Sequence, residues 1–451
     1  MPHSSFGAFG RRFFGASSHL DSDRDGGMTT RRWWLAAALA ALALAGCGGG
    51  EDRTKAPLRF VNASSGYAAL DLVIDDVRRF SSVGYGQGPA YVEIDPSRTA
   101  ARVSTPGSAT ALVSLTPALV KQRHSTLLAY GRTGALATVL LEEEQTAPDS
   151  GKALVRVVNA APEAGALDVY LTAVADPLTG AVATQAAAAV GAVGAFSTLD
   201  AGTWRLRVTR AGDRNDLRLD RSDIVLDSRA VTTLVLTPAS GGVLVNALWL
   251  AQQGAITAKP VQHARVRVAA GLPAAGTVSA SVGGVALLAA VGSPAVGAYQ
   301  LVPAGDQPVA LTVNAAALPA PNRVLNPGSE HTLLVHDLGG SATASWIDDD
   351  NQPPLSSARA KLRLVHGMAG GTGALSMTLD RLPVAGGVLA GTASAAVDVD
   401  PGTSLALSVN AAGVGAPVFE AMDQTLAAGS VYSVFVLGGP LPAIGVLRRD
   451  R

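Results

Sequence analysis

The chain of 451 residues has one cysteine, few aromatic residues and no long apolar run. A single cysteine cannot form an intramolecular disulfide, so every domain must be large enough to be stable on its own core. The apolar run from Trp33 to Ala45 covers thirteen residues, whereas a membrane-spanning helix needs about 20. A permanent membrane span is therefore not expected.

Signatures of common catalytic sites are also absent from the sequence. There is no Gly-x-Ser-x-Gly elbow, no His-Glu-x-x-His zinc motif and no phosphate-binding Gly-x-x-x-x-Gly-Lys loop. We therefore predict that the protein is not an enzyme, and that it has no catalytic, cofactor-binding or metal-binding residues.

The region from Met28 to Cys47 has the layout of a secretory signal ending in a lipobox. Arg31 and Arg32 precede the apolar run, and small residues lead from it to Cys47. Gly48-Gly49-Gly50 follow as a flexible tether, which argues against Cys47 being an ordinary buried thiol.

This pattern resembles bacterial lipoprotein signal peptides. The resemblance implies cleavage before Cys47 and acylation of Cys47, with palmitate among the acyl chains. Each buried CH₂ group stabilises membrane attachment by about 0.8 kcal/mol, so several acyl chains hold firmly. In Gram-negative lipoproteins an Asp after the cysteine favours the inner membrane, and Gly48 stands there instead. We expect a lipid anchor in the outer membrane of a bacterial cell envelope, on either its periplasmic or its surface face.

The start of the chain divides accordingly. A start at Met28 gives a signal peptide of ordinary length over residues 28–46, followed by a tether over 47–56. Residues 1–27 do not fit a signal peptide, and we interpret them as an extension upstream of the true translation start.

Four later segments begin alike, each with an arginine flanked by apolar residues. They are Leu58-Arg59-Phe60-Val61-Asn62-Ala63, Val155-Arg156-Val157-Val158-Asn159-Ala160, Val266-Arg267-Val268-Ala269-Ala270 and Leu362-Arg363-Leu364-Val365-His366-Gly367. Their arginines lie 97, 111 and 96 residues apart, which is the spacing of domains and too long for a solenoid repeat.

Each segment opens a series of short alternating strands separated by turn residues. Six or seven such strands in about 95 residues predict an all-β fold of tandem antiparallel β-sandwich modules of immunoglobulin-like type. The predicted modules cover residues 57–146, 152–252, 263–350 and 359–451.

Three of the recurring features together resemble the bacterial domain of unknown function 4397 (DUF4397). They are the opening arginine strand with Asn159-Ala160-Ala161-Pro162, the second strand Leu167-Asp168-Val169-Tyr170, and the late strand from Gly429 to Val436. In the third module Val278-Ser279 replaces the Leu-Asp pair. The resemblance implies an exported, often lipid-anchored envelope or surface protein, and it brings no functional residues with it.

The predicted linkers Glu143 to Gly151, Ala251 to Gln262 and Asp348 to Ser357 are rich in proline, polar and small residues. Pro353-Pro354 favours an extended spacer. These linkers predict a string of modules with little contact between neighbours.

Charge excludes one class of partner. After removal of residues 1–46, 30 basic and 32 acidic residues remain, and the arginines are scattered singly along strands. Nucleic acid needs a clustered basic surface, so no nucleic-acid partner is expected. The scattered arginines are interpreted as a solvated strand face.

Two groups of residues were considered as metal sites. The nearest candidate for a metal site is His331 with His336 and Asp337. The two histidines lie five apart, so on a strand they point to opposite faces and cannot bind one ion together without a bulge. The acidic runs Glu142-Glu143-Glu144 and Asp348-Asp349-Asp350 are interpreted as solvated residues at sheet edges, with calcium at a module junction as the alternative.

We therefore expect a non-catalytic, lipid-anchored envelope protein whose modules bind or support protein or glycan partners. A surface adhesin or matrix protein is the first alternative, and an enzyme of unrecognised type the second. The sequence predicts no oligomeric state.

Overall fold

The computed structural model describes residues 53–273, 276–369, 373–439 and 443–451. They belong to one compact unit that extends from Asp52 to Arg451. Their regular structure is β-strand except for one 3-10 turn, η1 (Pro162–Ala164). Over these ranges no helix is long and apolar enough to cross a membrane. The predicted all-β fold is confirmed.

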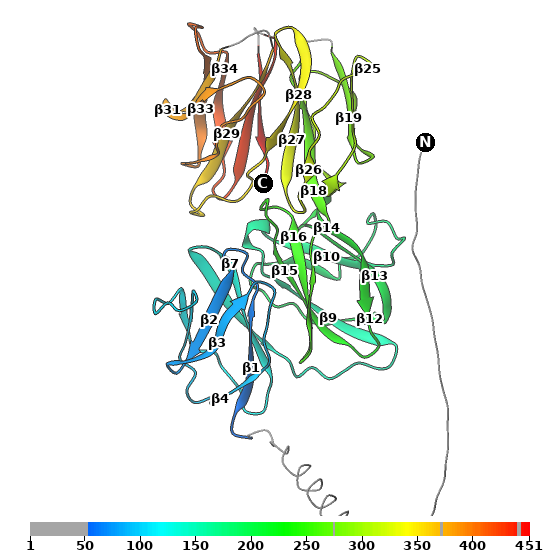
Figure 1. Cartoon of the computed structure of the whole chain (residues 1–451), viewed down its shortest axis with the longest axis vertical. Coiled ribbons are helices and arrows are strands. Elements are labelled where there is room, and N and C mark those ends of the chain that lie inside the picture. Colours follow the sequence, from blue (N-terminus) through cyan, green and yellow to red (C-terminus); the bar gives the residue numbers. More distant parts are fainter. Residues whose placement is uncertain (1–52, 274–275, 370–372, 440–442) are drawn as a thin grey trace, which may run out of the picture. The chain divides into compact units, whose positions relative to one another are not determined.

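The strands form four consecutive groups, modules 1 to 4, each with two main sheets that enclose an apolar core (Figure 1). Module 1 has sheets β4-β1-β7-β8 and β3-β2-β5-β6. Its strands are β1 (Ala56–Asn62), β2 (Ala69–Ile74), β3 (Val77–Gly84), β4 (Val92–Ile94), β5 (Ala101–Ser104), β6 (Val113–Leu115), β7 (Ser125–Arg132) and β8 (Ala135–Glu142).

Module 2 has sheets β12-β9-β15-β16-β17 and β11-β10-β13-β14. Its strands are β9 (Lys152–Asn159), β10 (Leu167–Thr172), β11 (Gln185–Ala188), β12 (Ser197–Asp200), β13 (Gly202–Arg210), β14 (Asp213–Leu226), β15 (Val231–Pro238), β16 (Val245–Ala251) and β17 (Ile256–Lys259). Strand β17 lies inside the predicted linker 251–262 and pairs with β16, so part of that segment is sheet rather than spacer.

Module 3 has sheets β21-β18-β27-β28, with β22 also on β18, and β20-β19-β24-β25, together with the small sheet β23-β26. Its strands are β18 (His263–Ala270), β19 (Thr277–Val282), β20 (Val285–Gly292), β21 (Ala295–Val296), β22 (Gln300–Pro303), β23 (Gly305–Asp306), β24 (Val309–Val313), β25 (Ala316–Ala317), β26 (Val324–Leu325), β27 (Glu330–Leu338) and β28 (Ser341–Asp348).

Module 4 has sheets β32-β29-β35-β36 and β31-β30-β33-β34. Its strands are β29 (Ala360–Met368), β30 (Leu375–Leu379), β31 (Leu382–Val388), β32 (Val397–Val399), β33 (Gly402–Ala411), β34 (Phe419–Leu426), β35 (Val431–Gly438) and β36 (Ile444–Arg449).

One strand pair in each module departs from the antiparallel rule. The opening strand runs parallel to a late strand of its own sheet, in the pairs β1 with β7, β9 with β15, β18 with β27 and β29 with β35. The chain visits the second sheet between these two strands, and a parallel pair requires such a crossover. The opening strand therefore lies in the middle of its sheet, where neighbours cover it.

The aspartate of the second strand holds a β-bulge. In module 2 the Asp168 carboxylate accepts the backbone N–H of Ala187 at 2.7 Å and that of Gly212 at 2.9 Å. Ala187 has a φ of 45°, a conformation that an L-residue adopts only when neighbours impose it. In module 3, Ser279 accepts one such bond, from Ala290 at 2.9 Å.

We expect Asp168→Ala to lower the free energy of unfolding by about 2–3 kcal/mol, because two backbone N–H groups lose a charged acceptor. Ser279→Ala removes one neutral bond and should cost about 1 kcal/mol. Urea unfolding of both variants checks this ranking, and equal losses would show that the bulge does not depend on the carboxylate.

Two apolar clusters join neighbouring modules. One combines Leu128 and Tyr130 of module 1 with Val235 and Leu248 of module 2. The other combines residues of module 3 with residues of module 4. Its buried members are Ala269, Leu334, Ile347, Val365, Phe435 and Leu437. The expected string of modules with little contact is therefore wrong: modules 1 and 2 form one pair, and modules 3 and 4 another.

The two pairs also touch. In module 2 the backbone N–H of Gly241 donates to the Gly328 carbonyl at 2.9 Å, and that of Val243 donates to the Glu330 carboxylate at 3.1 Å. Arg132 of module 1 donates to the backbone of Leu355, in the last linker, at 2.7 Å. The modules contact one another although the linkers contain proline, so the linkers do not act as extended spacers.

Candidate functional site

The predicted lipidation site, Cys47, lies outside the described residues, as do the predicted signal peptide and upstream extension. Acylation of Cys47 therefore stays a prediction. The described part of the chain contains no group of three or more His, Cys, Asp or Glu side chains that could hold a metal ion.

The two histidines considered as ligands lie apart on β27. The His331 ring contacts the Trp346 ring edge-on, and its Nε2 lies 2.8 Å from the Ser329 hydroxyl. His336 Nε2 lies 3.0 Å from the hydroxyl of Ser345. Burial lowers the pKa of both histidines, so both are neutral at physiological pH and act in packing.

Each of the four recurring arginines makes the same kind of hydrogen bond in its own module. Each donates from Nε to a hydroxyl at the paired position of the parallel strand. The pairs are Arg59 with Thr126 at 3.1 Å, Arg156 with Thr233 at 2.9 Å, Arg267 with Thr332 at 2.8 Å and Arg363 with Ser433 at 2.7 Å. All four arginines are buried, so the interpretation of this face as solvated is wrong. The adjacent module covers it.

Buried carboxylates complete the arrangement between modules 3 and 4. Arg267 of module 3 forms an ion pair with Asp450, at the end of module 4. Arg363 of module 4 pairs with Asp349, at the end of module 3, at 2.7 Å. Both carboxylate side chains are fully buried. The pairing is thus crosswise and ties each module to its neighbour.

Modules 1 and 2 carry an incomplete version of this arrangement. Arg59 pairs with Glu143 at 2.9 Å, and Glu143 accepts the backbone N–H of Gln253 in module 2 at 2.6 Å. In module 2, Gln252-Gln253 follow β16, at the position where modules 1, 3 and 4 have a carboxylate after the equivalent strand. The middle residue of each acidic run is therefore a buried partner of arginine, and its interpretation as a solvated edge residue is wrong.

The pKa values follow from this balance of burial and charge. Burial opposes ionisation of Asp349, but the guanidinium groups of Arg363 and Arg267 outweigh it and lower the pKa of Asp349. Burial raises the pKa of Glu330, although Arg265 at 3.1 Å acts in the opposite direction. These buried groups lie at the contacts between modules.

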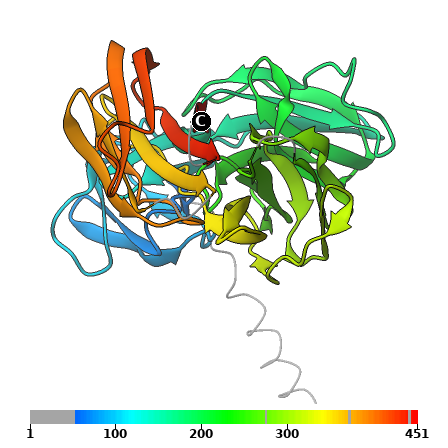
Figure 2. The same cartoon turned by 90° about the horizontal axis from the view of Figure 1, so that it is seen from above.

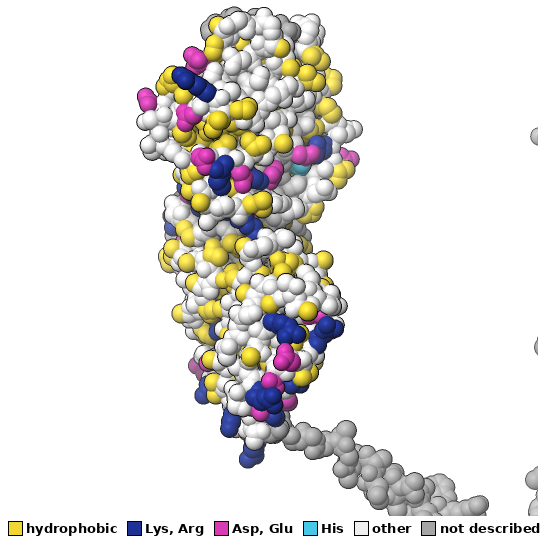
Figure 3. All heavy atoms as spheres, turned by 90° about the vertical axis from the view of Figure 1, so that its left-hand side faces the viewer, with side chains coloured by type: hydrophobic (Ala, Val, Ile, Leu, Met, Phe, Trp, Pro, Cys, Tyr) yellow, Lys and Arg dark blue, Asp and Glu magenta, His cyan; other side chains and the backbone are white. Residues whose placement is uncertain are grey.

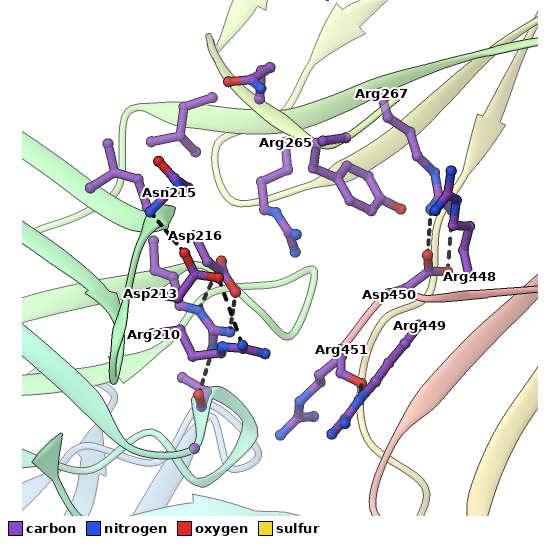
Figure 4. Close-up of a pocket in the computed structure, with 18 of the residues that line it drawn as sticks. Arg210, Asp213, Asn215, Asp216, Arg265, Arg267, Arg448, Arg449, Asp450 and Arg451 are labelled. Atoms are coloured by element: carbon purple, nitrogen blue, oxygen red, sulfur yellow. Dashed lines mark hydrogen bonds and ion pairs between the residues drawn. The ribbon is translucent and has the colours of Figure 1, made fainter. Parts of the chain in front are cut away.

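A cavity of about 1180 Å³ opens where modules 2, 3 and 4 meet. Its walls come from the β13–β14 hairpin, from β18 and the segment before β22, and from the C-terminal residues (Figure 4). Figure 2 shows the C-terminal end beside module 2, where Arg451 donates to the Pro162 carbonyl at 3.3 Å.

The cavity lining includes eight arginines and four aspartates. Arg210, Arg218 and Arg267 pair with aspartates in the lining, and Arg265 pairs with Glu330. Among the described residues, the other four arginines donate to main-chain oxygens, three to peptide carbonyls and Arg449 to a terminal oxygen of Arg451. They are Arg214, Arg448, Arg449 and Arg451. The cavity is therefore rich in basic side chains, although the chain as a whole is nearly neutral.

On the face shown in Figure 3, basic and acidic side chains lie together in small mixed groups. Burial, with the nearby charge of Arg218, lowers the pKa of Arg451 to about 10. The sequence did not predict this site because its residues come from several segments far apart in the chain.

Sequence comparison matches residues 56–170 and 264–378 to the family described as domain of unknown function (DUF4397). The chain belongs to this family. The two DUF4397 matches begin in β1 and β18 and end in β10 and β30, so each covers the first module of a pair and the first two strands of the second. Four copies of the DUF4397 unit stay a prediction.

No curated protein matches the chain. Among solved structures, the Bacillus anthracis TIE protein aligns over 86% of this chain and 68% of its own, at 8% identity and a TM-score of 0.13. A likeness of that size supports no argument about this DUF4397 protein.

Proposed function

We propose that the protein is a non-catalytic, lipid-anchored component of the bacterial cell envelope that serves as a rigid binding scaffold. The observation that carries the scaffold role is the crosswise burial of Arg267 with Asp450 and of Arg363 with Asp349. A mismatched contact would leave one of these charges buried without its partner, so the ion pairs fix which faces of modules 3 and 4 meet. The apolar cluster that includes Leu334, Val365 and Phe435 stabilises that contact.

The proposed anchor rests on Cys47 at the end of the lipobox-like segment. A tether of a few glycines would hold a body of four packed modules close to the membrane, with loops and sheet edges available to protein or glycan partners. The outer membrane is the proposed location, on either of its faces.

We expect Cys47→Ser to prevent acylation and to move the protein from the membrane fraction to the soluble fraction. Fractionation followed by mass spectrometry of the N-terminal peptide measures both. A Gly49→Ser variant is the matched control, since it alters the tether but leaves the cysteine. Continued membrane association of Cys47→Ser would overturn the anchor.

The face of the outer membrane that carries the protein is determined by adding a protease to intact cells that produce the protein with a tag after Arg451. Loss of the tag would support surface display and a role in adhesion or matrix binding. Protection until the outer membrane is permeabilised would support a periplasmic scaffold.

A further inference from the structure

We propose that the cavity between modules 2, 3 and 4 binds an acidic saccharide through its arginines. The inference rests on the proposed binding function and names the ligand class for it. It does not depend on the lipid anchor.

The first argument is charge. Arg214, Arg448 and Arg449 are exposed. Arg214 and Arg448 donate to backbone carbonyls rather than to side-chain carboxylates, and Arg449 donates through Nε to a terminal oxygen of Arg451. A guanidinium group binds carboxylate or phosphate oxygens strongly and often through two parallel hydrogen bonds. Several such groups around one cavity favour a ligand with more than one negative charge.

A second argument is an unsatisfied donor. The Nη1 of Arg451 is buried and has no hydrogen-bond partner among the described residues. Buried donors normally have partners. Arg451 lines the cavity, so a small turn of its side chain would bring this donor within reach of an anionic oxygen bound there. An anionic oxygen would satisfy this donor and offset the repulsion between Arg451 and Arg218.

Size and composition favour a saccharide over a small inorganic ion. The cavity of about 1180 Å³ exceeds the volume of a single phosphate or carboxylate group and suits a short oligosaccharide. Asn215, Gln300 and Asp213 line the same cavity, and side chains of these types pair with sugar hydroxyls. Figure 4 shows Asn215 and Asp213 on one side and Arg448, Arg449 and Arg451 on the other.

The test is calorimetric titration of the detergent-solubilised whole chain. The probes are an oligogalacturonate, its neutral methyl ester and a sugar bisphosphate. We expect the oligogalacturonate or the sugar bisphosphate to bind, with affinity falling as salt is raised, and the methyl ester not to bind. The two charged probes distinguish carboxylate from phosphate as the recognised group.

The informative variant is Arg448→Ala with Arg449→Ala, because both side chains are exposed and truncation of exposed side chains usually changes stability little. Affinity should fall about tenfold for each arginine removed, and the double lysine variant should recover part of it. Arg123→Ala, an exposed arginine of module 1 away from the cavity, should bind as the unaltered chain does.

Binding of neither charged probe, or equal binding by the double alanine variant, would overturn the inference. Equal affinity for an oligoglutamate peptide would contradict the saccharide component. Cys47→Ser should bind the probe unchanged, so failure of the anchor and failure of the cavity can be told apart.

Discussion

Asp349→Ala is expected to lower the free energy of unfolding by about 3–5 kcal/mol, because it leaves a buried guanidinium group without its carboxylate. The Asp349 carboxylate accepts from Arg363 at 2.7 Å, from Thr332 at 2.6 Å and from Tyr299 at 2.5 Å. All of these partners lose a charged acceptor at once. Chemical denaturation followed by circular dichroism measures the loss.

The neighbouring residue provides a matched control. Asp350 is exposed and pairs with Lys361 at 2.8 Å, so Asp350→Ala should cost no more than about 1 kcal/mol. Adding Arg363→Met to Asp349→Ala should recover part of the loss, because no buried charge then lacks a partner. Similar effects of the two single aspartate variants would contradict the buried pair.

The same pair predicts a dependence on pH. The pKa of Asp349 is lower in the folded protein, so its stabilising effect is complete above the ordinary aspartate value of about 3.9 and is lost as the pH falls below that. The pKa of Glu330 is raised in the folded protein, so ionisation of Glu330 lowers the free energy of unfolding as the pH rises. The difference in unfolding free energy between the unaltered chain and Asp349→Asn isolates Asp349, and a difference that does not shrink in acid would contradict its role.

Phe435→Ala is expected to cost about 3–5 kcal/mol, the range for removing a buried aromatic side chain. Phe435 belongs to β35 but lies on the side of the sheet that faces module 3, in the cluster with Leu334 and Val365. The guanidinium carbon of Arg267 lies 4.7 Å from its ring centre. The substitution therefore removes both apolar contact and a cation–π contact across the module boundary.

The control for Phe435→Ala is Met422→Ala in the same module. Met422 is 67% exposed, so its truncation should change the unfolding free energy by less than about 0.5 kcal/mol. Denaturation of both variants gives the comparison. If Phe435→Ala changed the unfolding free energy as little as Met422→Ala, module 3 would not cover the Phe435 side chain.

The sequence predicted the strands well because alternation marks the face that packs inside each sandwich. It failed on the other face of the opening and late strands. Arg59 and Arg363 alternate with apolar residues as solvent-facing residues do, and an adjacent module covers them all the same. Local periodicity cannot show a partner that lies about a hundred residues away.

A signal for this packing was nevertheless present. The arginine, the hydroxyl residue of the late strand and the acidic residue after the last strand recur together in modules 1, 3 and 4. When three polar residues recur together at matching positions, the pattern favours a contact among them over three independent solvent-exposed side chains. The cavity carried no such signal, because Arg214, Arg265 and Arg449 belong to different segments and to no common motif.

Cleavage of the last linker tests the pairing of modules most directly. Leu355 is 84% exposed, so a recognition site for a sequence-specific protease can replace residues 355–358. After cleavage, gel filtration should elute module 4 together with the rest of the chain, and Phe435→Ala should weaken that association. If module 4 separates from the rest of the chain after cleavage without the Phe435→Ala substitution, the account of modules joined by crosswise buried charges is contradicted.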